Sequence, residues 1–235
     1  MRLITISAVF ILVLSKPSFC QNNRIITARA QSVQNNYANA NVGGIISGKI
    51  YNLKYLHAIN SQFYNDSYPT KGSLVYDGVF FPSIKIQYDL FIQKVIVLLE
   101  AKNSSRYVSI DTDKVAEFSI GEFRFVHITK DSIMEKGLHE LGYSGVNSKV
   151  FIKRIKDRRD KTVEGKNVLA FSDENTYYVT NQFGTFHITN KKSLFNAYQN
   201  PTKIKELLKK NKIKISKRKL EQRLVKAVTL IDFNQ

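Results

Sequence analysis

The stretch Leu-Val-Tyr-Asp-Gly-Val-Phe-Phe, residues 74–81, decides the fold class of this chain. Asp77 and Gly78 lie between two apolar runs, a pattern typical of a type I′ β-hairpin, in which both central residues need a positive φ. Pro82 follows directly and is expected to interrupt strand pairing, because proline has no amide hydrogen to donate to a sheet. Further strands are expected at residues 84–88 and 91–100.

Short apolar runs of the same kind continue towards the C-terminus. Gly121 separates two of them and is expected to form a bulge or a tight corner. The connecting segments are too short for helical crossovers, so we expect antiparallel pairing, as a sandwich or an open barrel. The predicted strands cover residues 106–111, 114–120, 122–128 and 148–156, followed by a three-stranded meander at residues 168–171, 176–180 and 185–189.

The periodicity becomes helical after residue 190, beginning with a short helix at residues 192–199. Asn200 and Pro201 place a capping residue before a proline at the first helical position, which predicts a second helix. Ser216 is expected to cap a last helix that carries an apolar stripe. The stripe consists of Leu220, Leu224, Ala227, Val228 and Ile231. The sequence therefore predicts an α+β fold, an antiparallel β-sheet assembly followed by two or three C-terminal helices that pack on the sheet.

The first twenty residues are typical of an export signal. Arg2 supplies a positive start, residues 3–14 an apolar run, and residues 18–20 a small-x-small cleavage site before Gln21. The apolar run is shorter than the roughly 20 residues that a membrane-spanning helix needs. We therefore expect an exported protein, periplasmic or outer-membrane-associated, with no transmembrane helix in its mature chain.

Cys20 is the one cysteine of the chain. Cleavage after it would leave a mature protein without disulfides or thiolate chemistry. Acylation of Cys20 is the alternative, which Phe19 disfavours because lipid processing prefers a small residue before the cysteine. The expected organisation is a signal peptide at residues 1–20, a flexible or loosely packed leader at 21–47, a β-rich domain at 48–190 and a basic helical region at 191–235.

The net charge of +17 is concentrated in two stretches. Residues 149–166 hold eight basic and three acidic side chains, and residues 201–235 hold eleven basic and three acidic ones. Such density attracts anionic polymers or lipid head groups with a strong salt dependence. The candidate anion-binding side chains are Lys153, Arg154, Lys156, Arg158, Arg159, Lys209, Lys210, Lys212, Lys214, Lys217, Arg218 and Lys219.

Familiar catalytic and metal motifs do not occur in this sequence. His139 and Glu140 lack the second histidine of a zinc helix, because position 143 is a tyrosine. We expect no metal site and no cofactor. Nucleic acid is not an expected partner, since no aromatic residues interleave the basic run. Glu117 and Glu122 are carboxylates that an enzyme acting on glycans could use if their surroundings separated their pKa values.

Four segments resemble an uncharacterised group of exported proteins from Bacteroidetes-type bacteria. They are the signal end Ser-Phe-Cys at residues 18–20, SLVYDGVFFPSIKIQYDLFIQKVIVL at 73–98, VAEFSIGEFRFVHI at 115–128 and KKSLFNAYQNPTKIKELLKKNKIKISK at 191–217. The resemblance covers most of the mature chain. It rests on the pattern of short strand-like apolar runs and on the lysine-rich C-terminal region. It implies a location in the cell envelope and no site residue.

The charge and the export signal together favour a non-enzymatic accessory or binding protein of the cell envelope. In this interpretation the basic C-terminal region attaches the protein to anionic envelope material. Two alternatives stay open: a glycan-active enzyme with an unrecognised carboxylate site, and a structural subunit that assembles through strand edges.

Overall fold

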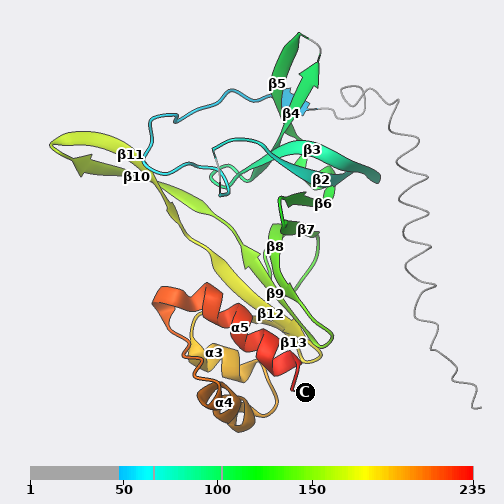
Figure 1. The fold of residues 1–235 in the computed structure, drawn as a ribbon, viewed down its shortest axis with the longest axis vertical. Coiled ribbons are helices and arrows are strands. Elements are labelled where there is room, and N and C mark those ends of the chain that lie inside the picture. The colour runs from blue at the N-terminus through cyan, green and yellow to red at the C-terminus, as the bar shows by residue number, and fades with distance from the viewer. Residues whose placement is uncertain (1–47, 66, 102, 235) are drawn as a thin grey trace, which may run out of the picture. The chain divides into compact units, whose positions relative to one another are not determined.

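An open antiparallel sheet dominates the part of the chain that the computed structural model describes, residues 48–65, 67–101 and 103–234 (Figure 1). Its eleven strands have the order β1-β5-β4-β3-β2-β6-β7-β8-β9-β12-β13. Three α-helices follow the last strand. The predicted α+β class, with a mainly antiparallel sheet and C-terminal helices, is confirmed. The predicted signal peptide and the leader at residues 21–47 lie outside the described residues.

The first strands are β1 (Gly48–Ile50), β2 (Thr70–Tyr76), β3 (Val79–Asp89), β4 (Lys94–Ala101), β5 (Ser104–Ile110), β6 (Val115–Ile120) and β7 (Phe123–Ile128). They are followed by β8 (Gly137–Ser144), β9 (Ser148–Lys153), β10 (Lys156–Val163), β11 (Lys166–Asp173), β12 (Thr176–Asn181) and β13 (Gly184–His187). The helices are α3 (Lys191–Asn196), α4 (Pro201–Lys210) and α5 (Leu220–Asp232), with short 3₁₀ turns η1 (Thr112–Lys114) and η2 (Lys217–Lys219).

The β2–β3 hairpin forms where the sequence predicts it. Asp77 and Gly78 have φ angles of 51° and 77°, the positive values that a type I′ turn requires. Pro82 interrupts the pairing locally, as expected, but it does not end the strand, because β3 continues to Asp89. The β2–β3 register shifts beside Pro82, so the proline occupies a β-bulge where the ladder is already irregular.

Two other turns decide where the neighbouring strands begin. The Asp89 carboxylate accepts hydrogen bonds from the backbone amides of Phe91 and Ile92 at 3.0 and 3.1 Å. This turn occupies the start of the predicted strand at residues 91–100, so β4 begins only at Lys94. Gly121 has a φ of 58° and forms the tight corner between β6 and β7, one of its two expected roles.

The strands after β9 pair differently from the predicted meander. Residues 148–156 do not form one strand, since β9 ends at Lys153 and β10 starts at Lys156. β11 pairs with β10 in a separate two-stranded hairpin, and β12 returns to pair with β9 and β13. Glu164 and Gly165 close the β10–β11 hairpin with φ angles of 52° and 76°. Their positive φ values make this a turn of the same kind as that at Asp77 and Gly78. The apolar pattern did not predict this hairpin because β10 consists mostly of charged residues.

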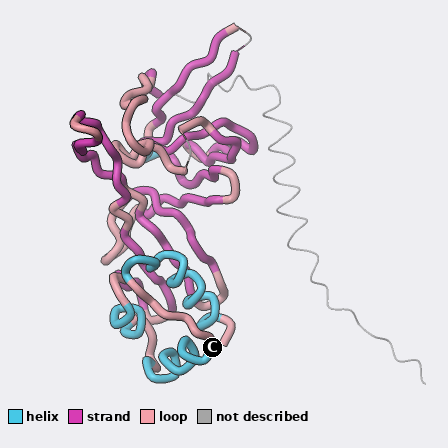
Figure 2. Tube along the Cα trace, turned by 60° about the vertical axis from the view of Figure 1, so that its left-hand side comes forward, coloured by secondary structure: helices cyan, strands magenta, loops and turns pink. Residues whose placement is uncertain are grey.

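The end of the sheet made by β8, β9, β12 and β13 is buried on both faces. Val150 and Ile152 of β9 pack in a cluster with the helices. Phe151, which points to the opposite face, packs with Met134 and Tyr178. β9 therefore buries side chains on both of its faces, which explains why polar and apolar residues do not sort cleanly along this strand. Both views place the helices beside this end of the sheet (Figure 2).

A separate cluster fills the other half of the sheet. It is built from large apolar side chains of β2 to β8 together with Tyr64, and Phe118 and Phe125 stack with ring centroids 4.6 Å apart. Its largest fully buried members are Tyr76, Tyr88, Phe118, Phe125, Leu74, Ile86, Leu90, Ile110 and Leu138. The burial of these rings explains why the chain contains many tyrosine and phenylalanine residues.

The C-terminal helices pack through the predicted stripe, whose five residues are all buried. Asn200 caps α4 as predicted, since its side chain accepts a hydrogen bond from the Lys203 amide at 3.1 Å and Pro201 occupies the first turn. Ser216 makes no such cap, and η2 leads into α5 instead, so that expectation is wrong. Among the described residues, every helix is too short or too polar to cross a membrane.

The capping box of α3 provides a test of local helix stability. The Asn190 side chain accepts from the amides of Lys192 and Ser193 at 2.8 and 3.1 Å, and Ser193 Oγ accepts from the Asn190 amide at 3.1 Å. We expect Asn190→Ala to lower the free energy of unfolding by about 1 kcal/mol, because orphan amides lose their acceptor. Urea unfolding measures the loss. Asn196→Ala, at the other end of the same helix, is the control, and an equal loss there would contradict the cap.

Candidate functional site

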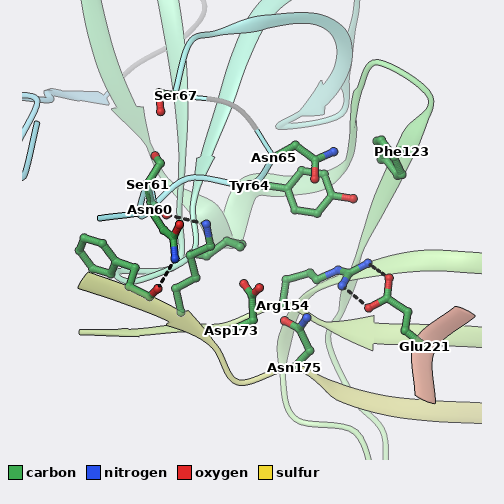
Figure 3. A pocket seen from close by; sticks show the side chains of 13 residues that line it. Asn60, Ser61, Tyr64, Asn65, Ser67, Phe123, Arg154, Asp173, Asn175 and Glu221 are labelled. Atoms are coloured by element: carbon green, nitrogen blue, oxygen red, sulfur yellow. Dashed lines mark hydrogen bonds and ion pairs between the residues drawn. The ribbon is translucent and has the colours of Figure 1, made fainter. Parts of the chain in front are cut away.

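A polar cleft of about 600 Å³ lies between the segment that precedes β2 and the strands β9 to β12 (Figure 3). Its lining combines amides, hydroxyls, charged groups and three rings. The lining residues are Asn60, Ser61, Tyr64, Asn65, Ser67, Leu90, Phe123, Arg154, Lys156, Phe171, Asp173, Asn175 and Glu221. These residues come from six separate parts of the chain, so the cleft exists only in the folded protein.

Arg154, which directly follows β9, joins two carboxylates from different elements. Its Nε donates to Glu140 of β8 at 2.6 Å, and its two terminal nitrogens donate to both oxygens of Glu221 of α5, each at 2.7 Å. Arg154 is 9% exposed and Glu140 is 5% exposed. A planar guanidinium matches a carboxylate in this two-pronged manner, so the ion pairs also orient α5 on the sheet.

Two tyrosines complete the Arg154 network. The Tyr64 hydroxyl donates to Glu140 at 2.8 Å, and the Tyr177 hydroxyl donates to Glu221 at 3.3 Å. The Arg154 guanidinium carbon lies 5.7 Å from the Tyr64 ring centroid, within cation–π range. Burial and the charge of Glu140 raise the pKa of Tyr64, so its hydroxyl keeps the proton that it donates.

Lys156 is the second cation of the cleft, and it is also engaged. Its amine donates to the backbone carbonyls of Ser61 and Phe63, the latter at 2.8 Å, and thereby ties the segment before β2 to β10. Burial lowers the pKa of Lys156, while Asp173 and Asp89 act in the opposite direction. Both cations of the cleft are therefore committed to internal contacts.

Several polar groups of the cleft lining have unused hydrogen-bonding capacity. The side chains of Asn65, Ser67 and Asp173 make no hydrogen bond with any described residue. The Asn175 side-chain oxygen accepts a hydrogen bond from the Ile155 amide at 3.4 Å, and the same side chain also interacts with the Tyr177 hydroxyl. The cleft thus offers both donors and acceptors to a bound molecule.

The structure does not gather the predicted cations of β9 and β10 on one surface. Lys153 is 6% exposed and points to the face opposite Arg154, because successive strand residues alternate in direction. Arg154 and Lys156 make the internal contacts described above. Arg159 is paired with Asp157 and Glu174. Of these five side chains, only Arg158 is exposed without a described ion pair or hydrogen bond.

The predicted cations of the C-terminal region have a different environment. Between α4 and α5 the chain is extended, and Ile213 and Ile215 pack towards the helix cluster while Lys212 and Lys214 alternate with them and are exposed. Residues 209–219 contain no acidic side chain. We define the basic strip as the exposed side chains of Lys209, Lys210, Lys212, Lys214, Arg218 and Lys219, none of which has an ion pair among the described residues. The side chain of Lys217 lies outside the described residues.

A buried histidine and a buried lysine lie side by side on the other face of β8 and β9. His139 is 0% exposed, its Nδ1 donates to the Gly137 carbonyl at 3.1 Å, and its Nε2 has no partner. Burial lowers the pKa of His139 to about 4, and the neighbouring Lys153 charge acts in the same direction. Burial also lowers the pKa of Lys153. Burial therefore disfavours the charged form of each group.

Glu117 and Glu122 do not line the cleft. Glu117 on β6 forms an ion pair with Arg124, and Glu122 is exposed in the corner between β6 and β7. Within the described residues, no group of three or more histidine, cysteine, aspartate or glutamate side chains is arranged to hold a metal ion.

Sequence reasoning missed the cleft and most of its residues. The sequence marks Glu140 only as the neighbour of a histidine and does not single out Glu221. Their roles depend on β8, β9 and α5 meeting around one guanidinium. One signal was available, because Arg154 falls on the otherwise apolar face shared with Val150 and Ile152, where a charge needs a partner.

No family model, curated protein or solved structure matches this chain.

Proposed function

We propose that this protein is a non-enzymatic binding protein of the cell envelope that attaches to anionic envelope material through the basic strip. The observation that carries the proposal is the contrast between the two groups of cations. Most of the cationic side chains of β9 and β10 make hydrogen bonds or ion pairs inside the protein. The cationic side chains of the basic strip are exposed and have no ion pair among the described residues.

The geometry of the strip suits a surface or a polymer better than a small anion. Its cations are distributed over the end of α4, the connecting residues 211–216 and η2, so they come from several consecutive parts of the chain surface. Exposed charges of this kind attract a polyanion over roughly a Debye length, about 8 Å at physiological salt. Export, inferred from the signal-like N-terminus, places such a surface next to acidic polysaccharides and lipid head groups.

Two observations favour binding over the other function classes. The described carboxylates of the cleft lining include Glu221, which Arg154 neutralises, and Asp173, so the cleft does not present a free acid and base pair. The edge strands of the eleven-stranded sheet, β1 and β13, have only three and four residues, and short edges disfavour extension of that sheet through strand pairing.

A charge-neutral triple variant tests the proposal. We expect Lys209→Gln, Lys212→Gln and Lys214→Gln, combined in the full chain, to weaken binding to heparin and to phosphatidylglycerol vesicles roughly tenfold and to reduce the salt dependence. Lysine-to-glutamine substitution keeps the side chain length and leaves the packed isoleucines untouched. Binding across a salt series, by titration with each probe, measures the effect.

The matched control removes the same net charge elsewhere. Lys71, Lys130 and Lys166 are exposed and without described partners, and their triple glutamine variant is expected to bind like the unmodified protein. Equal weakening of binding in both variants would mean that the net charge of the protein, and not the position of the basic strip, determines binding. The proposal would then be wrong. Preference for heparin indicates a polymer ligand, and preference for vesicles indicates lipid head groups.

A further inference from the structure

We propose that the polar cleft beneath the segment at residues 60–65 is a binding site for an uncharged saccharide. The cleft lies around Arg154 and does not include the basic strip, so this inference stands apart from the proposed attachment to anionic material. Its volume of about 600 Å³ falls within the usual range of small-molecule sites.

The charge of the cleft argues for a neutral ligand. The Arg154 guanidinium directs all its nitrogens to Glu140 and Glu221, and the Lys156 amine donates to two backbone carbonyls. An anionic ligand would have to displace these partners, at the cost of leaving a buried carboxylate unpaired. Asp173, exposed at the wall, would in addition repel it. A cationic ligand would be repelled by the Arg154 guanidinium and the Lys156 amine, which are held in place by these contacts.

The free polar groups of the lining suit hydroxyl groups. Each sugar hydroxyl can donate one hydrogen bond and accept others, so it binds best where acceptors and donors alternate. Asp173 offers a carboxylate, and Asn65 and Ser67 offer both kinds of group. Amide side chains and a carboxylate provide this mixture without requiring a charged ligand.

The rings of the lining supply the apolar part of a sugar site. Phe123 and Tyr64 contact each other edge to face, with centroids 5.5 Å apart, and both contribute to the cleft (Figure 3). The C–H face of a pyranose ring packs against such surfaces, while its hydroxyl edge stays directed to polar groups. Tyr64 is held by Glu140, so its ring is oriented before the ligand arrives.

The experiment measures binding of the full chain to neutral oligosaccharides of glucose, mannose, galactose, xylose and N-acetylglucosamine. Matching uronic-acid and sulfated oligosaccharides are included. Two wall variants are used: Asp173→Ala, whose side chain has no described hydrogen bond, and Phe123→Leu, which removes the ring and keeps an apolar group. We expect about tenfold weaker binding of a neutral oligosaccharide to Asp173→Ala and about fivefold weaker binding to Phe123→Leu.

The control variants change the same residue types outside the cleft. Asp160→Ala lies on the exposed β10 strand, and Phe183→Leu lies in the β12–β13 turn, where Phe183 is 43% exposed. Both are expected to bind like the unmodified chain, and the thermal unfolding midpoint confirms that all four variants are folded. Binding to no neutral oligosaccharide, tighter binding to the acidic series, or binding that both wall variants leave unchanged would each overturn the proposal.

Discussion

Replacing Arg154 by methionine is expected to lower the free energy of unfolding by about 3–5 kcal/mol, because the substitution leaves Glu140 charged, buried and without its cation. The same change releases Glu221 of α5, which loses both of its hydrogen bonds to the guanidinium. Urea unfolding at neutral pH, with linear extrapolation to water, measures the difference.

Two comparisons make the Arg154 result specific. Arg158→Met removes an exposed arginine without a described partner and is expected to change stability by no more than about 0.5 kcal/mol. Glu140→Gln combined with Arg154→Met is expected to recover part of the loss, since the amide carries no charge. Similar losses in Arg154→Met and Arg158→Met, or no recovery in the double variant, would show that the unpaired Glu140 carboxylate does not cause the loss.

Stability is expected to fall by roughly 3 kcal/mol between about pH 6.5 and pH 4 because of His139. In the folded protein burial holds the pKa of this histidine at about 4, against 6.5 for the free side chain. Between these values the unfolded chain binds a proton that the folded chain does not, so unfolding becomes more favourable as the pH falls. Below about pH 4 both states are protonated and the contribution no longer changes.

The variant His139→Leu isolates this effect. It is expected to remove the acid-dependent loss, so that its stability approaches or exceeds that of the unmodified protein at low pH. The charged groups nearest His139 are Lys153, Glu135 and Asp131, and they are unchanged in the comparison. His187→Leu, at an exposed position on β13, is the control and is expected to keep the acid-dependent loss. Parallel pH profiles for the unmodified protein and His139→Leu would contradict the prediction.

Local chemistry was enough to predict many individual elements. The turn at Asp77 and Gly78 was predictable because its positive φ angles depend on two adjacent residues. The cap at Asn200 was predictable for the same reason, since side chain and amide are three residues apart. The stripe of α5 followed from helical periodicity alone.

Predictions failed where pairing partners are distant in sequence. β12 skips the β10–β11 hairpin to pair with β9, and a strand's own residues do not specify which edge it joins. Pro82 was expected to interrupt strand pairing, and it does so only locally, at a bulge in the β2–β3 ladder, so β3 continues through it. The candidate anion-binding side chains of β9 and β10 do not share one surface, because neighbouring strand residues face opposite ways and meet different partners.

The sequence by itself determined the α+β class, the first hairpin, the apolar stripe of the last helix and the concentration of positive charge, because each depends on residues close together in the chain. Only the tertiary structure decided which cations are free. Lys212 and Lys214 stay exposed since the residues beside them supply the packing, whereas Arg154 is enclosed by Glu140 and Glu221, fourteen and 67 residues away. Charge is a property of composition, but its availability depends on which carboxylates folding brings within hydrogen-bond distance.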